Sequence, residues 1–430
     1  MTDPGTNAWP IVPLGELGQW GSGGTPRRGV DGYYKGSIPW LKIGDLTDGV
    51  VTTSEESISE AGLRNSAAKL VEPGTLLIAM YGSIGKLGIP AMQCATNQAI
   101  AFCVPDRRKV STDYLFQALL ALRSDLIAQG KGGTQSNISQ TVLKAFGVPV
   151  PPLPVQERIV TLARRTSEIR NQTRGHLVRA SRLLERFRQS VLDAACAGKL
   201  TAGWRVRVGS DNASPPIDDD AAESDSLPKL PRTWAWTTPD ELRVPGRPIT
   251  YGVIKLGAEL AGGVPTLRSS DVRMLSIDES GVKRIATSIA DNYARTYLQG
   301  GEILVTVRGS LGGVAVVPEY MRGWNISREV AMIPVDKALP QYVALAIASP
   351  RSQSWINNAT KGVTYTGINI RDLKRLPIPI PSLTEQREIL KQVEALFNLA
   401  DSVSKRIDAA SRATQNCGQA VLAKAFERDA

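Results

Sequence analysis

The chain has 430 residues, of which 42% are hydrophobic and 21% are charged. This length suffices for two or more domains with their own cores. We see neither a signal-peptide-like run at the N-terminus nor an apolar stretch long enough to cross a bilayer, so we expect a cytoplasmic protein. The net charge of +10 favours a polyanionic partner such as nucleic acid, although many basic proteins bind nothing anionic.

The first half combines short apolar segments with few helices. Residues 38–46 predict a strand and a turn, and residues 76–80 predict a buried strand. Residues 97–104 predict a further strand, and residues 112–128 predict an amphipathic helix ahead of a polar loop at 131–139. Strands mixed with few helices indicate an α+β domain.

A single long helix is predicted to follow the proline-rich exit of the first half. From Gln156 there is no proline until Pro215, and apolar or small residues recur at alternating spacings of three and four. Sustained spacing of this kind is typical of the seam of a coiled coil. At about 1.5 Å per residue, the helix would span roughly 60 Å. The large apolar residues predicted for its seam are Ile159, Leu162, Ile169, Leu183 and Phe187.

A segment from Gly209 to Asp225 separates the two halves. It is polar, acidic and proline-bearing, which is the composition of an unstructured linker. The second half then repeats the order of the first, as expected for an internal duplication. Its segments 264–272, 301–312, 327–333 and 340–355 match 38–46, 73–85, 97–103 and the helix at 112–128.

A second long helix closes the repeat. An offset of 230 residues carries Gln156 onto Gln386 and Val191 onto Val421, and no proline follows Gln386. The large apolar residues predicted for the second seam are Ile389, Val393, Leu396, Val403 and Ile407. The two seams bury best against each other in an antiparallel pair. The alternative is two independent amphipathic helices, each lying on its own domain.

The predicted fold is therefore α+β, with two pseudo-repeated globular domains separated by two long antiparallel coiled-coil helices. The segments 33–72 and 260–299 share little identity, so we expect one scaffold with two different recognition surfaces. The predicted segments are a first domain at 1–154, a first helix at 155–204, a linker at 205–231, a second domain at 232–382 and a second helix at 383–430.

The residues that catalysis would need are sparse. His176 is the only histidine and lies on the predicted seam, which argues against a Ser-His-Asp triad or a histidine-rich metal site. The run from Gly82 to Lys86 resembles part of a phosphate loop, but its spacing fails the Walker pattern and a tight turn explains it better. The four cysteines are scattered, which predicts free thiols. We find no amino-methyltransferase motif and no nuclease cluster of carboxylates and lysine, so the sequence favours a binding protein.

Polar loops beside basic residues recur at matching places in the two halves, which favours contacts with DNA. Asparagine and glutamine pair with adenine, and arginine and lysine with guanine, in the major groove. For any one of these residues, a solvated surface side chain remains the alternative. The predicted DNA-contacting residues of the first half are Lys42, Lys86, Lys131, Gln135, Ser136 and Asn137. Those of the second half are Arg268, Arg273, Arg308, Lys361, Thr364, Tyr365, Thr366 and Asn369.

Six segments carry a family resemblance that covers nearly the whole chain. They are Gly24-Thr25-Pro26, residues 38–46, residues 73–78, Gly82-Ser83-Ile84-Gly85, residues 149–159 and residues 197–205. In this order and with this duplication, the chain resembles the specificity subunit of a type I restriction-modification system. The second half departs from the pattern, with Thr266 in place of Trp40 and Arg268 in place of Lys42.

The resemblance implies two target-recognition domains, each reading one half of a split DNA sequence, and two conserved helices that hold them apart. It implies double-stranded DNA, two methyltransferase subunits and restriction subunits as partners. The chain itself would be neither an enzyme nor a holder of cofactors, since S-adenosylmethionine, ATP and Mg²⁺ would bind to the partner subunits. Two alternatives are a stand-alone DNA-modifying enzyme and a coiled-coil scaffold that does not bind DNA.

Overall fold

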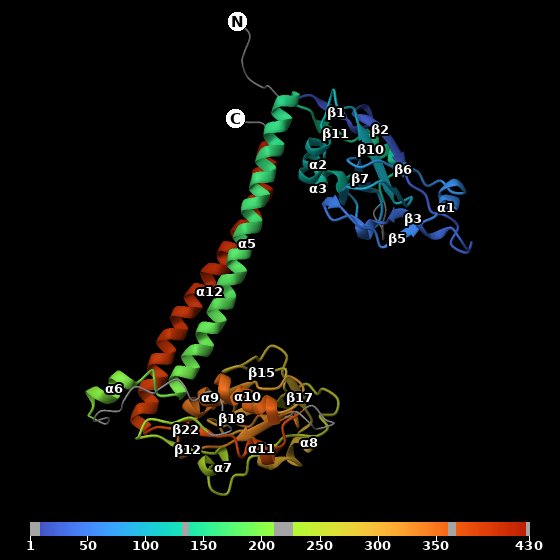
Figure 1. Ribbon diagram of the computed structural model, residues 1–430. Coiled ribbons are helices and arrows are strands. Elements are labelled where there is room, and N and C mark those ends of the chain that lie inside the picture. The colour runs from blue at the N-terminus through green and yellow to red at the C-terminus, as the bar shows by residue number, and fades with distance from the viewer. Residues whose placement is uncertain (1–8, 131–136, 210–226, 360–366, 427–430) are drawn as a thin grey trace. The chain divides into compact units, whose positions relative to one another are not determined.

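The computed structural model describes residues 9–130, 137–209, 227–359 and 367–426, with side chains as far as residue 417 (Figure 1). The chain divides into two compact units. The first unit comprises residues 1–178 and 408–430, and the second comprises residues 179–407. Each unit therefore contains one globular domain together with parts of both long helices.

The first domain is built on a five-stranded sheet and a four-stranded sheet. The five-stranded sheet has the order β2 (Gly18–Ser22), β10 (Ile100–Pro105), β7 (Leu76–Ala79), β8 (Leu87–Pro90) and β4 (Gly49–Val51). The four-stranded sheet has the order β5 (Glu56–Ile58), β3 (Tyr34–Leu41), β9 (Cys94–Thr96) and β6 (Leu70–Val71). The remaining elements are the pair β1 (Ile11–Pro13) and β11 (Gly147–Pro149), the helices α1 (Glu60–Arg64), α2 (Thr112–Ala121), α3 (Arg123–Ala128) and α4 (Gln140–Ala145), and the short helices η1 (Leu14–Glu16) and η2 (Ile43–Asp45).

Strand β7 lies inside the five-stranded sheet and is buried on both faces, which confirms the strand predicted at 76–80. Because side chains alternate between the two faces of a strand, Leu76 and Ile78 enter one core with Tyr114 of α2. Leu77 and Ala79 enter a second core on the opposite face. A continuous apolar run is what a strand in this position requires.

The second domain repeats this plan. Its four-stranded sheet has the order β13 (Thr250–Tyr251), β21 (Val330–Ile333), β18 (Ile303–Thr306) and β19 (Val314–Val316), so β18 takes the place of β7. Its three-stranded sheet has the order β17 (Lys283–Ile285), β14 (Val264–Leu267) and β20 (Asn325–Ile326). The remaining elements are the pairs β12 (Ala235–Thr237) with β22 (Ile378–Ile380) and β15 (Val272–Arg273) with β16 (Ser276–Ile277), the helices α7 (Pro239–Leu242), α8 (Thr287–Asp291), α9 (Pro340–Ala348), α10 (Pro350–Ala359) and α11 (Ile370–Leu373), and the short helices η3 (Ala294–Thr296) and η4 (Glu319–Met321).

Two helices predicted as continuous are each broken into two. The helix predicted at 112–128 is interrupted at Leu122, and the turn there lets Arg123 donate to both carboxylate oxygens of Asp48. The helix predicted at 340–355 is interrupted at Ser349, ahead of α10. Pro350 follows Ser349, and a proline disfavours the helical conformation of the residue before it, which explains the second break.

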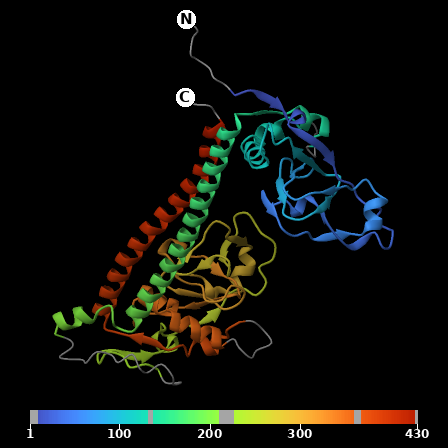
Figure 2. The same cartoon turned by 45° about the horizontal axis from the view of Figure 1, so that its top comes forward.

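The two long helices are α5 (Leu153–Cys196) and α12 (Leu383–Phe426), each of 44 residues. Within the second unit, the last part of α5 runs antiparallel to the first part of α12 (Figures 1 and 2). Arg188 donates to Asp401 at 2.5 Å, whereas Val191, further along α5, shares a core with Val393, which lies earlier in α12. A short helix, α6 (Ala202–Arg207), follows α5, and most of the predicted linker lies outside the described residues.

The predicted seams hold better for α12 than for α5. Ile159, Ile389 and Val393 are buried, Leu396 packs against the core of the second domain, and Ile407 is half-buried, as predicted. The prediction is wrong for the residues whose side chains are exposed: Leu162, Ile169, Leu183, Phe187 and Val403. In α5 the less exposed positions, such as Leu184 and Arg188, lie one residue later than predicted, because the burial follows the contact with α12. Because residues 183 and 184 are both leucines, the sequence spacing fits a seam through either one.

A glutamine at the start of each long helix ties that helix to its own domain. The Gln156 side chain accepts a hydrogen bond from the Ser111 backbone N–H at 2.9 Å and donates to the Pro151 carbonyl at 2.8 Å. The Gln386 side chain accepts from the Leu339 N–H at 2.9 Å and donates to the Pro381 carbonyl at 2.9 Å. Both glutamines are fully buried. Each one therefore joins the proline-rich exit to the start of α2 or α9.

Replacing either buried glutamine with leucine is expected to lower the free energy of unfolding by about 1–3 kcal/mol, because the backbone groups that it satisfies would stay buried without partners. Urea unfolding of Gln156→Leu and Gln386→Leu would measure the loss. Gln172→Leu, on an exposed position of α5, is the matched control and should change stability by less than about 0.5 kcal/mol. Equal effects at all three positions would contradict the role of the buried pair.

Candidate nucleic-acid interface

Half of the predicted DNA-contacting residues fall outside the described part of the chain. These are Lys131, Gln135, Ser136, Lys361, Thr364, Tyr365 and Thr366. The other half are described, and their contacts within the protein differ. They are Lys42, Lys86, Asn137, Arg268, Arg273, Arg308 and Asn369.

The end of each polar loop contacts the turn that follows the central strand of its domain. In the first domain, the Ile138 N–H donates to the Met80 carbonyl at 3.0 Å, and Asn137 forms a bridge with Tyr81. In the second domain, the Ile368 N–H donates to the Val307 carbonyl at 3.0 Å, and Gly367 bridges Arg308. The same frame therefore brings the turn and the loop together in both domains. The predicted repeat holds at the level of single hydrogen bonds.

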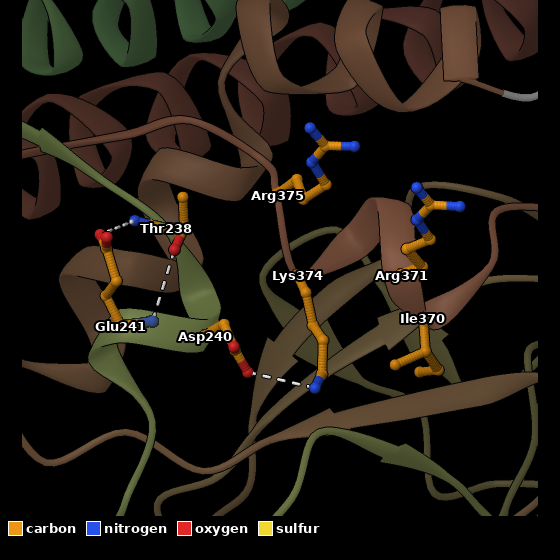
Figure 3. Close-up of a pocket in the computed structure, with 7 residues that line it drawn as sticks. All are labelled: Thr238, Asp240, Glu241, Ile370, Arg371, Lys374 and Arg375. Atoms are coloured by element: carbon orange, nitrogen blue, oxygen red, sulfur yellow. Dashed lines mark hydrogen bonds and ion pairs between the residues drawn. The ribbon is translucent and has the colours of Figure 1, made fainter.

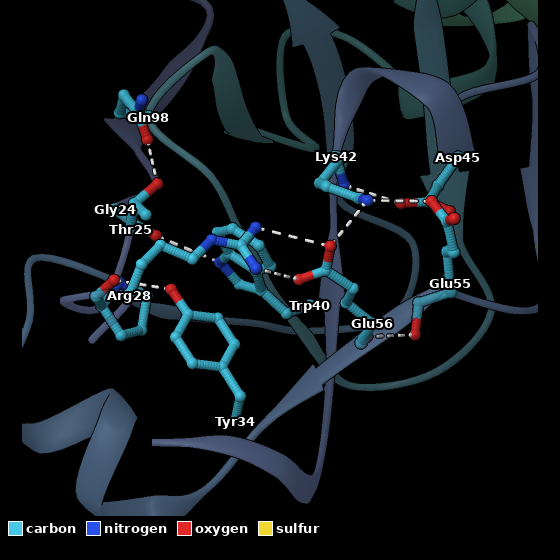
Figure 4. A network of polar contacts seen from close by, with 12 residues as sticks. Gly24, Thr25, Arg28, Tyr34, Trp40, Lys42, Asp45, Glu55, Glu56 and Gln98 are labelled. Atoms are coloured by element: carbon cyan, nitrogen blue, oxygen red, sulfur yellow. Dashed lines mark hydrogen bonds and ion pairs between the residues drawn. The ribbon is translucent and has the colours of Figure 1, made fainter. Parts of the chain in front are cut away.

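Lys42 is held between two carboxylates in the first domain (Figure 4). Its Nζ lies 2.8 Å from Glu55 Oε2 and 2.8 Å from Glu56 Oε1. Arg28 also donates to Glu56, at 2.9 Å, and its guanidinium lies over the rings of Tyr34 and Trp40. Hydrogen bonds from Lys42 and Arg28 lower the pKa of Glu56, and those from Lys42 to Glu55 and Glu56 raise its own pKa.

Three more predicted cations make contacts within their own domain. The Arg268 guanidinium donates to Asp271 and to the Gly281 carbonyl, the latter at 2.5 Å. The backbone N–H of Arg268 donates to the Asp271 carboxylate at 2.8 Å, as that of Lys42 does to Asp45 at 2.7 Å. Arg273 pairs with Asp278 at 3.5 Å, and Lys86 Nζ donates to the Ile43 carbonyl at 3.2 Å. Lys42, Arg268, Arg273 and Lys86 therefore each have a partner within their own domain, and their contacts with DNA stay a prediction.

Arg308 is exposed and, unlike these four cations, donates from its side chain to no carboxylate or carbonyl in the described part of the chain. Its guanidinium carbon lies 5.7 Å from the centre of the Tyr251 ring. The Tyr251 hydroxyl accepts a hydrogen bond from the Ile370 N–H at 2.9 Å, which fixes the ring. The donors of Arg308 therefore face solvent from a held position.

A second basic group, which the sequence analysis missed, lies on and after α11. Asn369, a predicted DNA contact, caps α11 by accepting from the Asp372 N–H at 2.8 Å. Arg371, Lys374 and Arg375 then line an open hollow with residues of α7 (Figure 3). Lys374 pairs with Asp240 at 3.2 Å, whereas Arg371 and Arg375 extend to the other side and have no carboxylate partner among the described residues.

The described residues carry neither a metal-binding cluster nor a membrane-spanning helix. No group of three or more His, Cys, Asp and Glu side chains could hold a metal ion there. Nor is any helix in those segments both long and apolar enough to span a membrane. All four cysteines are free, as predicted, and burial raises the pKa of Cys94 and Cys103 to about 12.

The sequence matches the family model described as "Type I restriction modification DNA specificity domain" at residues 7–172 and again at 258–410. The chain belongs to this family. Both matched segments reach from a globular domain into a long helix, so the duplication seen in the structure is a duplication of the specificity domain.

Proteins named as specificity subunits are among the relatives of this chain. It is 28% identical to the type I restriction enzyme EcoBI specificity subunit of Escherichia coli, over 91% of this chain and 80% of that protein. It is 27% identical to the EcoKI specificity subunit of Escherichia coli strain K12, over 90% of this chain and 82% of that protein. These matches confirm the predicted resemblance and favour it over both alternatives.

Solved structures agree on the fold. The HsdS subunit from Thermoanaerobacter tengcongensis aligns with a TM-score of 0.57 and 19% identity over the whole of both chains. A chain from a structure on complex assembly and conformational transition of the type I restriction-modification system aligns with a TM-score of 0.69 and 17% identity, over 99% of each chain. The predicted α+β fold, with two specificity domains and two long antiparallel helices, is confirmed.

Proposed function

We propose that the chain is the DNA-recognition subunit of a type I restriction-modification complex and reads a two-part asymmetric site, one part with each domain. The observation that supports this most directly is the repeated strand, turn and loop frame. The frame is the same in both domains, but it carries Tyr81 in the first and Arg308 in the second. A shared frame with different exposed side chains suits the recognition of two different half-sites.

The partners that we propose are double-stranded DNA, two methyltransferase subunits docked on α5 and α12, and restriction subunits. In this arrangement S-adenosylmethionine, ATP and Mg²⁺ bind to the partner subunits, and the chain itself catalyses no reaction. We place such a complex in the cytoplasm. The net charge of +10 supports a polyanionic ligand, and the relatives that share most of its length are named specificity subunits.

The test is to express the chain with the methyltransferase encoded beside it and to map methylated adenines across the genome by long-read sequencing. We expect a single motif with two defined parts and an unspecified spacer of fixed length. A folded, expressed methyltransferase that produces no motif in the presence of this chain would contradict the proposal.

Arg371 and Arg375 are proposed to contact DNA phosphates. Replacing both with alanine should weaken DNA binding by a similar factor at all sites and reduce the slope of log K against log salt by about 2, since each phosphate contact contributes about 0.9. DNA binding measured at several salt concentrations would show this. The control is Arg322→Ala, at an exposed arginine that pairs with Glu319 in the same domain. An unchanged slope in the double variant would contradict the proposal.

A further inference from the structure

Tyr81 and Arg308 occupy the same point of the repeated frame. Each follows the central strand of its domain and precedes a glycine with positive φ, which is +67° at Gly82 and +75° at Gly309. Each also bridges the first described residue of its polar loop, Asn137 or Gly367. The two backbones therefore present an exposed side chain at an equivalent place, and the chemistry of that side chain differs completely.

The frame positions Arg308 closely. A Cβ atom on Gly367 would lie 3.0 Å from Arg308 Cγ and 2.7 Å from the Val307 carbonyl oxygen, so glycine lets the loop approach the arginine stem. The Tyr251 ring lies on one side of the guanidinium, and burial raises the pKa of the Tyr251 hydroxyl above its ordinary value. Glu329, whose backbone carbonyl accepts from the Arg308 N–H, already accepts from the Ser269 hydroxyl at 2.8 Å with its carboxylate.

Arg308 thus combines a held side chain with donors that no group in the described part of the chain accepts. By contrast, Lys42 and Arg268, two of the other predicted cations, donate to carboxylates and, in the case of Arg268, also to a carbonyl. An arginine presents two parallel N–H groups that match O6 and N7 of guanine in the major groove. A tyrosine offers one hydroxyl and a ring edge, so it cannot make that paired contact.

We propose that Arg308 reads a guanine in the half-site bound by the second domain, and that Tyr81 holds the matching position in the first domain and reads a different base there. The inference rests on the proposed function and adds to it the residue pair that makes the two half-sites differ. A contact of Arg308 with a phosphate, in place of a base, would make it a positioning residue without sequence preference.

The experiment is the methylation map repeated with Arg308→Gln and Tyr81→Ala. In Arg308→Gln we expect one position of one half-site to lose its preference for guanine by roughly 5- to 150-fold, which corresponds to 1–3 kcal/mol, and to shift towards adenine. The other half-site and the spacer should stay unchanged. Tyr81→Ala should alter one position in the opposite half-site. Arg322→Gln, at an exposed arginine of the second domain, is the matched control and should leave the whole motif unchanged.

Each contrary result has its own meaning. A uniform loss of methylation at all sites in Arg308→Gln would mean a phosphate contact, and an unchanged motif would place Arg308 outside the interface. Changes from both variants within one half-site would break the equivalence of the two positions. Any of these results would overturn the inference about Arg308 and Tyr81. The proposed function would still stand, provided that the unaltered protein gives a two-part motif. A motif missing from the unaltered protein would overturn the proposed function, and the inference with it.

Discussion

Replacing Glu385 with alanine is expected to lower the free energy of unfolding of the second unit by about 3–5 kcal/mol, because the change removes one partner of a buried ion pair. The side chains of Arg205 and Glu385 are only 5% and 3% exposed, and Nη1 of the arginine lies 2.6 Å from Oε1 of the carboxylate. Glu385 also accepts from the Thr201 hydroxyl at 2.7 Å and from the Trp234 indole N–H at 2.9 Å. One carboxylate thus joins the start of α12 to the segment after α5 and to the start of the second domain.

The test is urea unfolding followed by tryptophan fluorescence, with two comparisons. The double variant Arg205→Met/Glu385→Leu should be more stable than Glu385→Ala, because apolar residues of similar size can replace a buried ion pair at little cost. Arg188→Ala removes the exposed pair with Asp401 and should cost no more than about 1 kcal/mol. If Glu385→Ala lowers the free energy of unfolding by less than about 1 kcal/mol, the pair of Arg205 and Glu385 is not shielded from water, which would contradict the prediction.

The buried pair belongs to the second unit alone. The residue that matches Glu385 at the start of α5 is Val155, which packs against the core of the first domain. The repeated scaffold can therefore start a long helix without a carboxylate at this position. It follows that Glu385 serves the junction with Arg205 and Trp234, and that its loss should leave the first domain intact.

The second large effect is expected from shortening both long helices by one heptad. Seven residues rise about 10.5 Å, or roughly three base pairs of DNA at 3.4 Å each, and a heptad changes the facing of a helix by only about 20°. Deleting 176–182 together with 405–411 keeps the register fixed by Arg188 and Asp401. Methylation at sites with the original spacer should be lost, and sites with a spacer about three base pairs shorter should be methylated in their place. Methylation of these sites should be slower than that of the original sites by the unaltered chain, because DNA also turns by roughly 100° over three base pairs.

The spacer is measured by mapping methylated adenines in cells that express the shortened chain. The matched control is the removal of seven residues at 212–218, inside the predicted linker, which should leave the spacer unchanged. A spacer that is the same in the helix-shortened chain and in the unaltered chain would show that the helices do not set the half-site separation.

The internal repeat could be predicted because matching residues recur in the two halves of the sequence. The breaks within the two shorter helices could be predicted only in part. The break at Ser349 has a signal in the proline that follows, whereas the break at Leu122 has no such signal and is accompanied by the pairing of Arg123 with the distant Asp48. The seam of α5 was misplaced by one residue for a related reason. Adjacent apolar residues such as Leu183 and Leu184 satisfy the spacing equally, and only the contact with α12 distinguishes them.

The candidate site was predicted as a set of residue types, and the structure sorts that set by partner. Lys42 looked available, but Glu55 and Glu56 reach it because β5 pairs with β3, which residue type alone does not reveal. Tyr81 was missed although the alignment of the two halves places it opposite Arg308. Arg371 and Arg375 were also missed, since the first half has Thr141 and Ala145 there and the prediction rested on features common to both halves.

The buried glutamines also bear on how such chains can diversify. Gln156 and Gln386 anchor each domain by contacts to backbone groups, with no dependence on the side chains of the recognition surface. A genetic crossover at the proline-rich exits would therefore transplant a whole recognition surface and leave its anchoring intact. New pairings of half-sites can then arise by exchange of modules, without a series of destabilising intermediates.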